Sequence, residues 1–139
     1  MIDNISNKSI NKIGVLGAGL MGHGITHAIA RSGLEVVMID TTLDKVENAL
    51  DRIKTILHND LKKQIISQEE FHTALKCISI SDDYDMLNGC NMIIEAVYED
   101  RGLKDLVISN ADELLSKDAI FASNTSTIPI SILAKTTTR

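Results

Sequence analysis

The chain has 139 residues, of which 44% are apolar and 24% charged, and its formal net charge is −5. This length and composition suggest one ordinary globular domain, and the acidic balance argues against a nucleic acid or an anionic membrane as partner. Cys77 and Cys90 are too few for a disulfide scaffold or a cysteine-based zinc site. No apolar run approaches the roughly 18 residues that a membrane span needs, so we expect a cytoplasmic protein.

The N-terminal part of the chain has two strand patterns separated by a helix pattern. We expect residues 1–11 to be a flexible lead-in to a domain that covers residues 12–139. Residues 12–17 form a short apolar strand, and the apolar spacing of the next residues predicts a helix that ends at Ser32-Gly33. Residues 35–40 are β-branched and apolar, which predicts a strand buried on both faces.

Strand and helix patterns continue to alternate after residue 40. Ser67 and Glu70 have the spacing of a capping box, and Pro129 suits the first turn of a last helix. The predicted elements are a helix from 43 to about 63, a short helix to 75, strands over 77–81, 91–97 and 119–123, and a helix over 101–115.

This alternation predicts an α/β fold, a Rossmann-like, doubly wound parallel sheet in three αβα layers. A six-stranded sheet of this kind would need more residues than follow the last predicted strand. We therefore expect a sheet that stops before its last strands.

A glycine motif, Gly17-Ala18-Gly19-Leu20-Met21-Gly22, joins the first strand to the first helix. Such a loop lets the backbone and the helix N-terminus approach a pyrophosphate. Asp40 follows at the end of the second strand, where a carboxylate accepts hydrogen bonds from ribose hydroxyls and repels a 2′-phosphate. The combination predicts NAD rather than NADP, and its context argues against an ordinary loop with an unrelated turn aspartate.

The four histidines offer no clear chemistry. His23 and His27 are four residues apart on one predicted helix and could meet one metal ion, but no third ligand is evident. We therefore expect no metal site, and we expect these two to be ordinary surface or interface histidines. His58 and His72 are isolated in polar surroundings.

Three segments together resemble the N-terminal domain of L-3-hydroxyacyl-CoA (3-hydroxybutyryl-CoA) dehydrogenases. They are Val15–Ile25, Ile94–Asp100 followed by Lys104, and Phe121–Ile130, which contains Asn124-Thr125-Ser126. Their order and spacing match across essentially residues 11–139, and the third segment is the most specific because many Rossmann proteins share only the first.

The resemblance implies NAD as cofactor, an acyl-CoA as substrate and a role for each matching residue. Ser126 would bond the substrate's 3-oxygen, Asn124 would position the nicotinamide, and Lys63 would meet the CoA phosphates. The expected cofactor-binding residues are Gly17, Ala18, Gly19, Leu20, Met21, Gly22, Asp40, Ala96, Glu99, Lys104 and Ser126.

The family's reaction is the reversible oxidation of a 3-hydroxyacyl-CoA to a 3-ketoacyl-CoA, with a histidine as base in a His-Phe-Phe-Asn-Pro stretch. The resemblance also implies a helical C-terminal domain and a homodimer for a full-length protein. The present sequence contains no such histidine stretch. We therefore expect this chain by itself to bind NAD without catalysis. The alternatives are a non-catalytic NAD-binding or structural protein and a dehydrogenase of hydroxyacyl-acyl-carrier-protein substrates.

Overall fold

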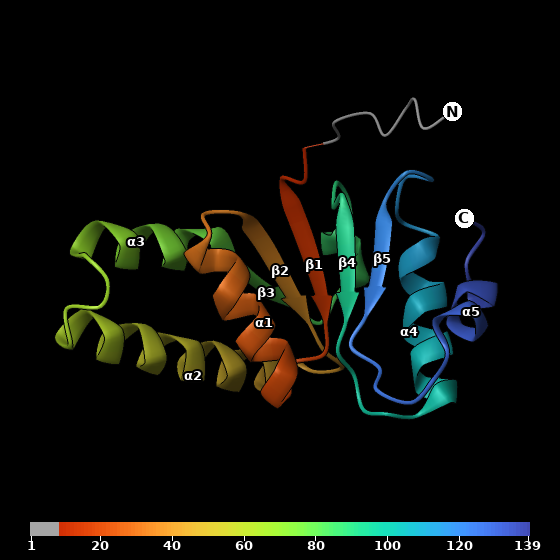
Figure 1. Cartoon of the computed structure of the whole chain (residues 1–139), viewed down its shortest axis with the longest axis horizontal. Helices are drawn as coiled ribbons and strands as arrows, with labels where there is room; N and C mark the ends of the chain where they lie inside the picture. Colours follow the sequence, from red (N-terminus) through yellow and green to blue (C-terminus); the bar gives the residue numbers. More distant parts are fainter. Residues whose placement is uncertain (1–8) are drawn as a thin grey trace.

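Five parallel strands form one sheet in the order β3-β2-β1-β4-β5 (Figure 1). The computed structural model describes residues 9–139, so most of the predicted flexible lead-in lies outside the described residues. The chain starts at the centre of the sheet, winds outward to β3 and then returns to the other side of β1, which confirms the doubly wound fold. The strands are β1 (Lys12–Leu16), β2 (Glu35–Ile39), β3 (Ile78–Ser81), β4 (Met92–Glu95) and β5 (Ile120–Ser123).

Helices cover both faces of the sheet, which gives the predicted three layers. Helices α1, α2 and α3 share one apolar cluster with one face, and α4, α5 and the short turn η1 share a second cluster with the other. The bounds are α1 (Leu20–Arg31), α2 (Leu43–Lys62), α3 (Gln68–Cys77), η1 (Tyr84–Leu87), α4 (Arg101–Asp112), α5 (Ile130–Leu133) and η2 (Ala134–Thr136).

The apolar residues of β2 explain why this strand is central to the domain. Val36 and Met38 pack in the first cluster, whereas Val37 and Ile39 pack in the second. All four are at most 1% exposed. Because successive side chains of a strand point to opposite faces, a continuous apolar run requires cover on both sides. The prediction of a strand buried on both faces is confirmed.

Helices α2 and α3 form a hairpin that extends past the sheet, at the left of Figure 1. The predicted capping box starts α3: the Glu70 amide donates to the Ser67 hydroxyl, and the Ser67 amide donates to the Glu70 carboxylate. Helix α2 has 20 residues, so at 1.5 Å per residue it extends about 30 Å away from Asp40.

Two predicted elements are shorter in the structure by more than one residue. The helix predicted to reach residue 115 ends at Asp112, where Arg139 binds the Asp112 side chain and the main-chain oxygens of Asp112 and Ser116. The strand predicted to reach residue 97 ends at Glu95, whose carboxylate accepts the Val97 amide and turns the chain. At the end of β4, therefore, a local side-chain hydrogen bond competes with the regular backbone pattern.

The expectation that the α1 histidines lie at the surface or at an interface is wrong for His23, which is 7% exposed within this single domain. It shares the buried face of α1 with Thr26 and Ile29, and its Nδ1 lies 2.8 Å from the Gly19 carbonyl oxygen. His27 is half-buried, and its Nε2 atom has no hydrogen-bond partner. Residues three and four apart share one face of a helix, so packing of the Ile29 face also buries His23.

Among residues 9–139, no helix is both long and apolar enough to cross a membrane. The same residues contain no group of three or more side chains that could hold a metal ion.

The residues just before β1 contact the domain. Ile10 packs against the first cluster, and the Asn11 amide donates to Asn91.

Candidate functional site

The glycine loop lies at the carboxyl end of β1, where the sheet winds in opposite directions. Gly17 has a φ of +106°, and a Cβ there would lie 2.7 Å from the Ala96 carbonyl oxygen. A Cβ on Gly22 would collide with the Gly17 carbonyl oxygen. Both glycines are therefore required by close backbone contacts, as expected for a tight strand-to-helix turn.

Gly19 differs from these two glycines because it opens to free space. A Cβ at Gly19 would meet no atom within 4 Å. Gly19 is also the N-cap of α1, and no side chain caps the helix. The first amides of α1, with the positive end of the helix dipole, are therefore left available for an anion.

Asp40 lies beside this loop, one residue after β2. Its Oδ2 accepts the Ala18 amide at 2.8 Å, and its Oδ1 accepts the Thr41 amide at 2.6 Å and lies 3.4 Å from Lys45 Nζ. Partial burial by itself raises the pKa of Asp40, but the Ala18 and Thr41 amides and Lys45 outweigh it and hold the pKa below its usual value. Asp40 is therefore a carboxylate at neutral pH, tied to the loop that precedes α1.

A groove of about 730 Å³ runs along the carboxyl ends of β1, β2, β4 and β5. These strand ends form the lower edge of the sheet in Figure 1. Its volume is in the range of small-molecule and cofactor sites. Leu20 and Tyr98, which line it, are 78% and 82% exposed, so two large side chains with apolar surface lie open at the groove. The predicted site residues that line it are Gly17, Gly19, Leu20, Met21, Asp40, Ala96, Glu99 and Asn124.

A charged cluster lies beneath the other end of this groove. Lys104 is 1% exposed, and its ammonium lies 2.8 and 2.9 Å from the two oxygens of Glu95, which is fully buried. The same ammonium lies 3.2 Å from Glu99 and donates to the Val97 carbonyl oxygen. Lys104, predicted to lie along the cofactor, is thus enclosed by protein oxygens and does not line the groove.

Glu99 joins this cluster to the loop after β5. Its Oε1 accepts hydrogen bonds from the hydroxyls of Thr125 and Thr127 and from the Thr127 amide. The Thr125 hydroxyl, with Thr127 and Lys104, lowers the pKa of Glu99 to about 2 against a smaller opposing effect of desolvation. Glu99 therefore stays ionised and holds the loop that carries Ser126.

Ser126 and Asn124 lie on this loop. Ser126 is exposed, and its amide lies 3.3 Å from Glu99. The Asn124 amide donates to the Glu95 carbonyl oxygen, which places Asn124 at the groove. The structure therefore brings Asn124, Ser126 and Glu99 together, although they come from two different loops.

Four other predicted site residues do not line the groove. Ser126 is one of them, although its amide lies 3.3 Å from the lining residue Glu99. Ala18 is 7% exposed and contributes its amide to Asp40. Gly22 is buried under the turn. Lys63 is exposed at the C-cap of α2, at the opposite end of that helix from Asp40.

Glu95 and Ser123 are functional candidates that sequence reasoning did not single out. The Ser123 hydroxyl donates to Glu95 Oε2 at 2.5 Å, so both residues belong to the cluster around Lys104. The available signal was an acid at the end of an apolar strand, nine residues before the lysine. Charged side chains are rarely buried without a partner, so this pattern could have predicted an internal ion pair.

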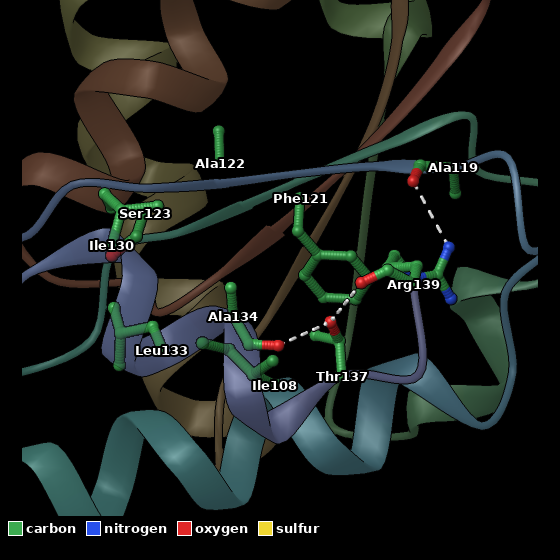
Figure 2. Close-up of a pocket in the computed structure, with 10 residues that line it drawn as sticks. All are labelled: Ile108, Ala119, Phe121, Ala122, Ser123, Ile130, Leu133, Ala134, Thr137 and Arg139. Atoms are coloured by element: carbon green, nitrogen blue, oxygen red, sulfur yellow. Dashed lines mark hydrogen bonds between the residues drawn. The ribbon is translucent and has the colours of Figure 1, made fainter.

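The histidines and the second cavity lie away from the groove. The four histidines are on α1, α2 and α3, and none lines it. A cavity of about 260 Å³ lies between β5, α4 and α5, and Figure 2 shows its mainly apolar lining. Arg139 lies at one side, 4.9 Å above the Phe121 ring, and donates to the Ala119 carbonyl oxygen. No acid or base in that lining is free for chemistry.

Comparison with known proteins relates this geometry to one family. Residues 12–139 match the family model described as "3-hydroxyacyl-CoA dehydrogenase, NAD binding domain". The chain is 35% identical over 130 residues to the 3-hydroxybutyryl-CoA dehydrogenase of Bradyrhizobium diazoefficiens, covering 94% of this chain and 44% of that protein. It is 35% identical over 128 residues to the fatty acid oxidation complex subunit alpha of Vibrio campbellii, covering 91% of this chain and 18% of that protein.

A solved structure agrees with these sequence relatives. The (S)-3-hydroxybutyryl-CoA dehydrogenase of Ralstonia eutropha superposes with a TM-score of 0.90 and 37% identity, over 94% of this chain and 46% of that one. The chain therefore spans less than half the length of the relatives it matches.

Proposed function

Because this chain belongs to the NAD-binding domain family of 3-hydroxyacyl-CoA dehydrogenases, we propose that its groove holds NAD in one defined direction. The adenosine ribose lies at Asp40, the pyrophosphate at Gly19 and the N-terminus of α1, and the nicotinamide over the ends of β4 and β5. The observation that carries this proposal is Gly19, whose backbone opens to the groove and to uncapped amides of α1.

We propose that the whole protein oxidises a 3-hydroxyacyl-CoA reversibly to the 3-ketoacyl-CoA. NAD, when bound, accepts the hydride. The Ser126 hydroxyl donates a hydrogen bond to the 3-oxygen of the substrate, and Asn124 positions the nicotinamide. Glu99 supports both roles indirectly, because it holds the Thr125–Thr127 segment through three hydrogen bonds to Thr125 and Thr127.

The proton acceptor for this reaction is not a histidine of the described residues. All four histidines lie on α1 to α3, away from the groove. A serine hydroxyl is too weak a base for the task and can only align the oxygen. We therefore expect the 139-residue chain to bind NADH but not to reduce acetoacetyl-CoA.

Three further assignments for the whole protein are proposals of the same kind. Lys63 contacts the CoA phosphates, which would require the acyl-CoA to reach the far end of α2. The protein is cytoplasmic, for which the two free cysteines are the supporting observation. A full-length form is a homodimer, as the family resemblance implies. Cell fractionation and sedimentation of that form would test the last two.

The cofactor proposal is tested by titrating NADH into the chain and into two glycine variants. Gly19→Ala adds a Cβ that meets no protein atom but projects into the groove. We expect normal stability and a loss of NADH affinity of about tenfold or more, as for overpacking by 1–3 kcal/mol.

Gly24→Ala is the matched control, because its Cβ also meets nothing within 4 Å and Gly24 does not line the groove. It should keep the affinity. Absence of NADH binding by the unmodified, folded chain would contradict the proposal, and so would equal affinities of the two variants.

A further inference from the structure

The cluster beneath the groove contains two carboxylates and one ammonium. Lys104 Nζ lies 2.8 Å from Glu95 and 3.2 Å from Glu99. No other positively charged side chain forms an ion pair with either acid among residues 9–139. With all three groups ionised, the cluster has a net charge of −1.

The two carboxylates of the cluster also accept hydrogen bonds from neutral donors. Glu95 accepts the Val97 amide at 2.7 Å and the Ser123 hydroxyl at 2.5 Å in addition to the ammonium. Glu99 accepts two hydroxyls and the Thr127 amide. Neutral donors of this kind do not cancel the charge of a carboxylate, so Lys104 is the only counter-charge that these hydrogen bonds and ion pairs provide within the cluster.

This cluster lies at the end of the groove opposite Asp40. Glu99 lines the groove with Val97, Tyr98 and Asn124, and its side chain is 33% exposed. The single positively charged residue among the lining residues, Lys45, lies at Asp40, where it forms an ion pair. No lining cation therefore offsets Glu99 at the end that would receive the nicotinamide.

The charged residues at the start of α4 do not make the Glu99 end of the groove positive. Asp100 caps the helix and accepts the Leu103 amide at 2.8 Å, which adds a carboxylate where the helix dipole is positive. Arg101 is 63% exposed and pairs with Asp105 one turn further along. The nicotinamide end therefore has an excess of acidic groups.

We propose that this acidic cluster makes the nicotinamide end of the groove favour NAD⁺ over NADH. The inference rests on the proposed placement of the cofactor. The oxidised nicotinamide ring carries a positive charge and the reduced ring is neutral, while the remainder of the cofactor is the same in both. A nearby negative charge therefore lowers the free energy of the oxidised complex selectively, by Coulomb attraction. The domain thereby favours the cofactor form that accepts hydride.

The test compares the dissociation constants of NAD⁺ and NADH for the chain and for Glu99→Gln. Glutamine keeps an acceptor oxygen for Thr125 and Thr127 and removes one negative charge. We expect the ratio of the NAD⁺ constant to the NADH constant to rise about three- to tenfold, as for a partly screened charge at short range. A displaced loop would weaken both complexes in parallel and leave the ratio unchanged.

Asp40→Asn is the matched control, because it removes the same charge at the other end of the groove. It should change both affinities together and leave the ratio unchanged. Raising the salt from about 0.05 M to about 0.5 M should reduce the difference between Glu99→Gln and the unmodified chain, since the Debye length shortens.

The outcomes separate this inference from the proposed function. If the unmodified chain binds neither cofactor form, the cofactor site itself is wrong. If it binds both and Glu99→Gln leaves the ratio unchanged, the inference is overturned. It is also overturned if Asp40→Asn moves the ratio as much as Glu99→Gln does.

Discussion

The two ends of the groove each present a carboxylate, but they hold it in different ways. Asp40 has local partners, namely the Ala18 amide, the neighbouring Thr41 and Lys45 on the next helix. Glu99 has partners 26 to 28 residues away, and it contacts a buried lysine. The Asp40 end is built from backbone groups around a glycine turn, whereas the Glu99 end depends on side-chain charges within the domain. We therefore expect substitutions at the two ends to have different effects on the unfolding free energy and on cofactor affinity.

The largest effect should come from Lys104→Met. This substitution leaves Glu95 buried without its counter-ion, and breaking a buried pair costs about 3–5 kcal/mol of unfolding free energy. Urea unfolding followed by circular dichroism measures it. Lys45→Met is the control at the Asp40 end, since that lysine is 59% exposed and an exposed pair contributes about 0–1 kcal/mol. Equal losses of unfolding free energy in the two variants would contradict the view that only the Glu99 end depends on a buried ion pair.

Gly22→Ala changes the Asp40 end of the groove, and we expect it to lower the unfolding free energy by less than Lys104→Met does. Its Cβ would collide with the Gly17 carbonyl oxygen, and relief of such a clash by backbone movement costs about 1–3 kcal/mol. Thermal unfolding and NADH titration of the same sample would show the two losses together. Gly24→Ala, in the same helix, should instead be neutral or stabilise the chain by up to about 1 kcal/mol. A stable Gly22→Ala chain with full affinity would contradict the tight-turn account.

Asp40→Arg should change cofactor preference without a large loss of stability. Removing the carboxylate ends repulsion of a 2′-phosphate, and arginine can bind one, so the NADPH-to-NADH affinity ratio should rise about tenfold or more. Titration of both cofactors measures it. Asp44→Arg makes the same charge change at an exposed residue outside the groove lining. If both variants shift the ratio equally, Asp40 is not the ribose acid.

The smallest effect should be the pH dependence contributed by Glu99. Its pKa is lowered from 4.5 to about 2 in the folded chain, so the folded state binds this proton less readily than the unfolded state. The stabilising contribution is therefore complete above about pH 4.5 and is lost as the pH falls toward 2. Unfolding free energies measured across this range should have a shallower slope in Glu99→Gln. An unchanged slope would show that Glu99 does not hold the loop.

Much of the Asp40 end could be predicted from the sequence, because its determinants are local. The glycine spacing, the preceding apolar strand and the acid after β2 lie within about 30 residues, and each encodes a backbone geometry that holds in any Rossmann domain. The Ser67 capping box was predictable for the same reason, since both of its hydrogen bonds lie within four residues.

The Glu99 end and the element boundaries could not be predicted in the same way. Periodicity indicates which face of an element is apolar, but it does not say which polar group that face meets. Lys104 was therefore predicted at the cofactor, whereas the fold encloses it against Glu95. His23 was expected at the surface or at an interface but is buried in the domain, and Arg139 binds the end of α4 from 27 residues away.

The sequence by itself therefore determined the order of strands and helices, the glycine turn with Asp40 beside it, and the family, because these depend on contacts between near neighbours along the chain. Only the tertiary structure decided which charges are buried, that Glu95 and Ser123 belong to the cluster around Lys104, and that Glu99 holds the Ser126 loop. The physical reason is that the free energy of a charge depends on its distance to other charges and on its removal from water. Both quantities are defined only once distant segments pack together.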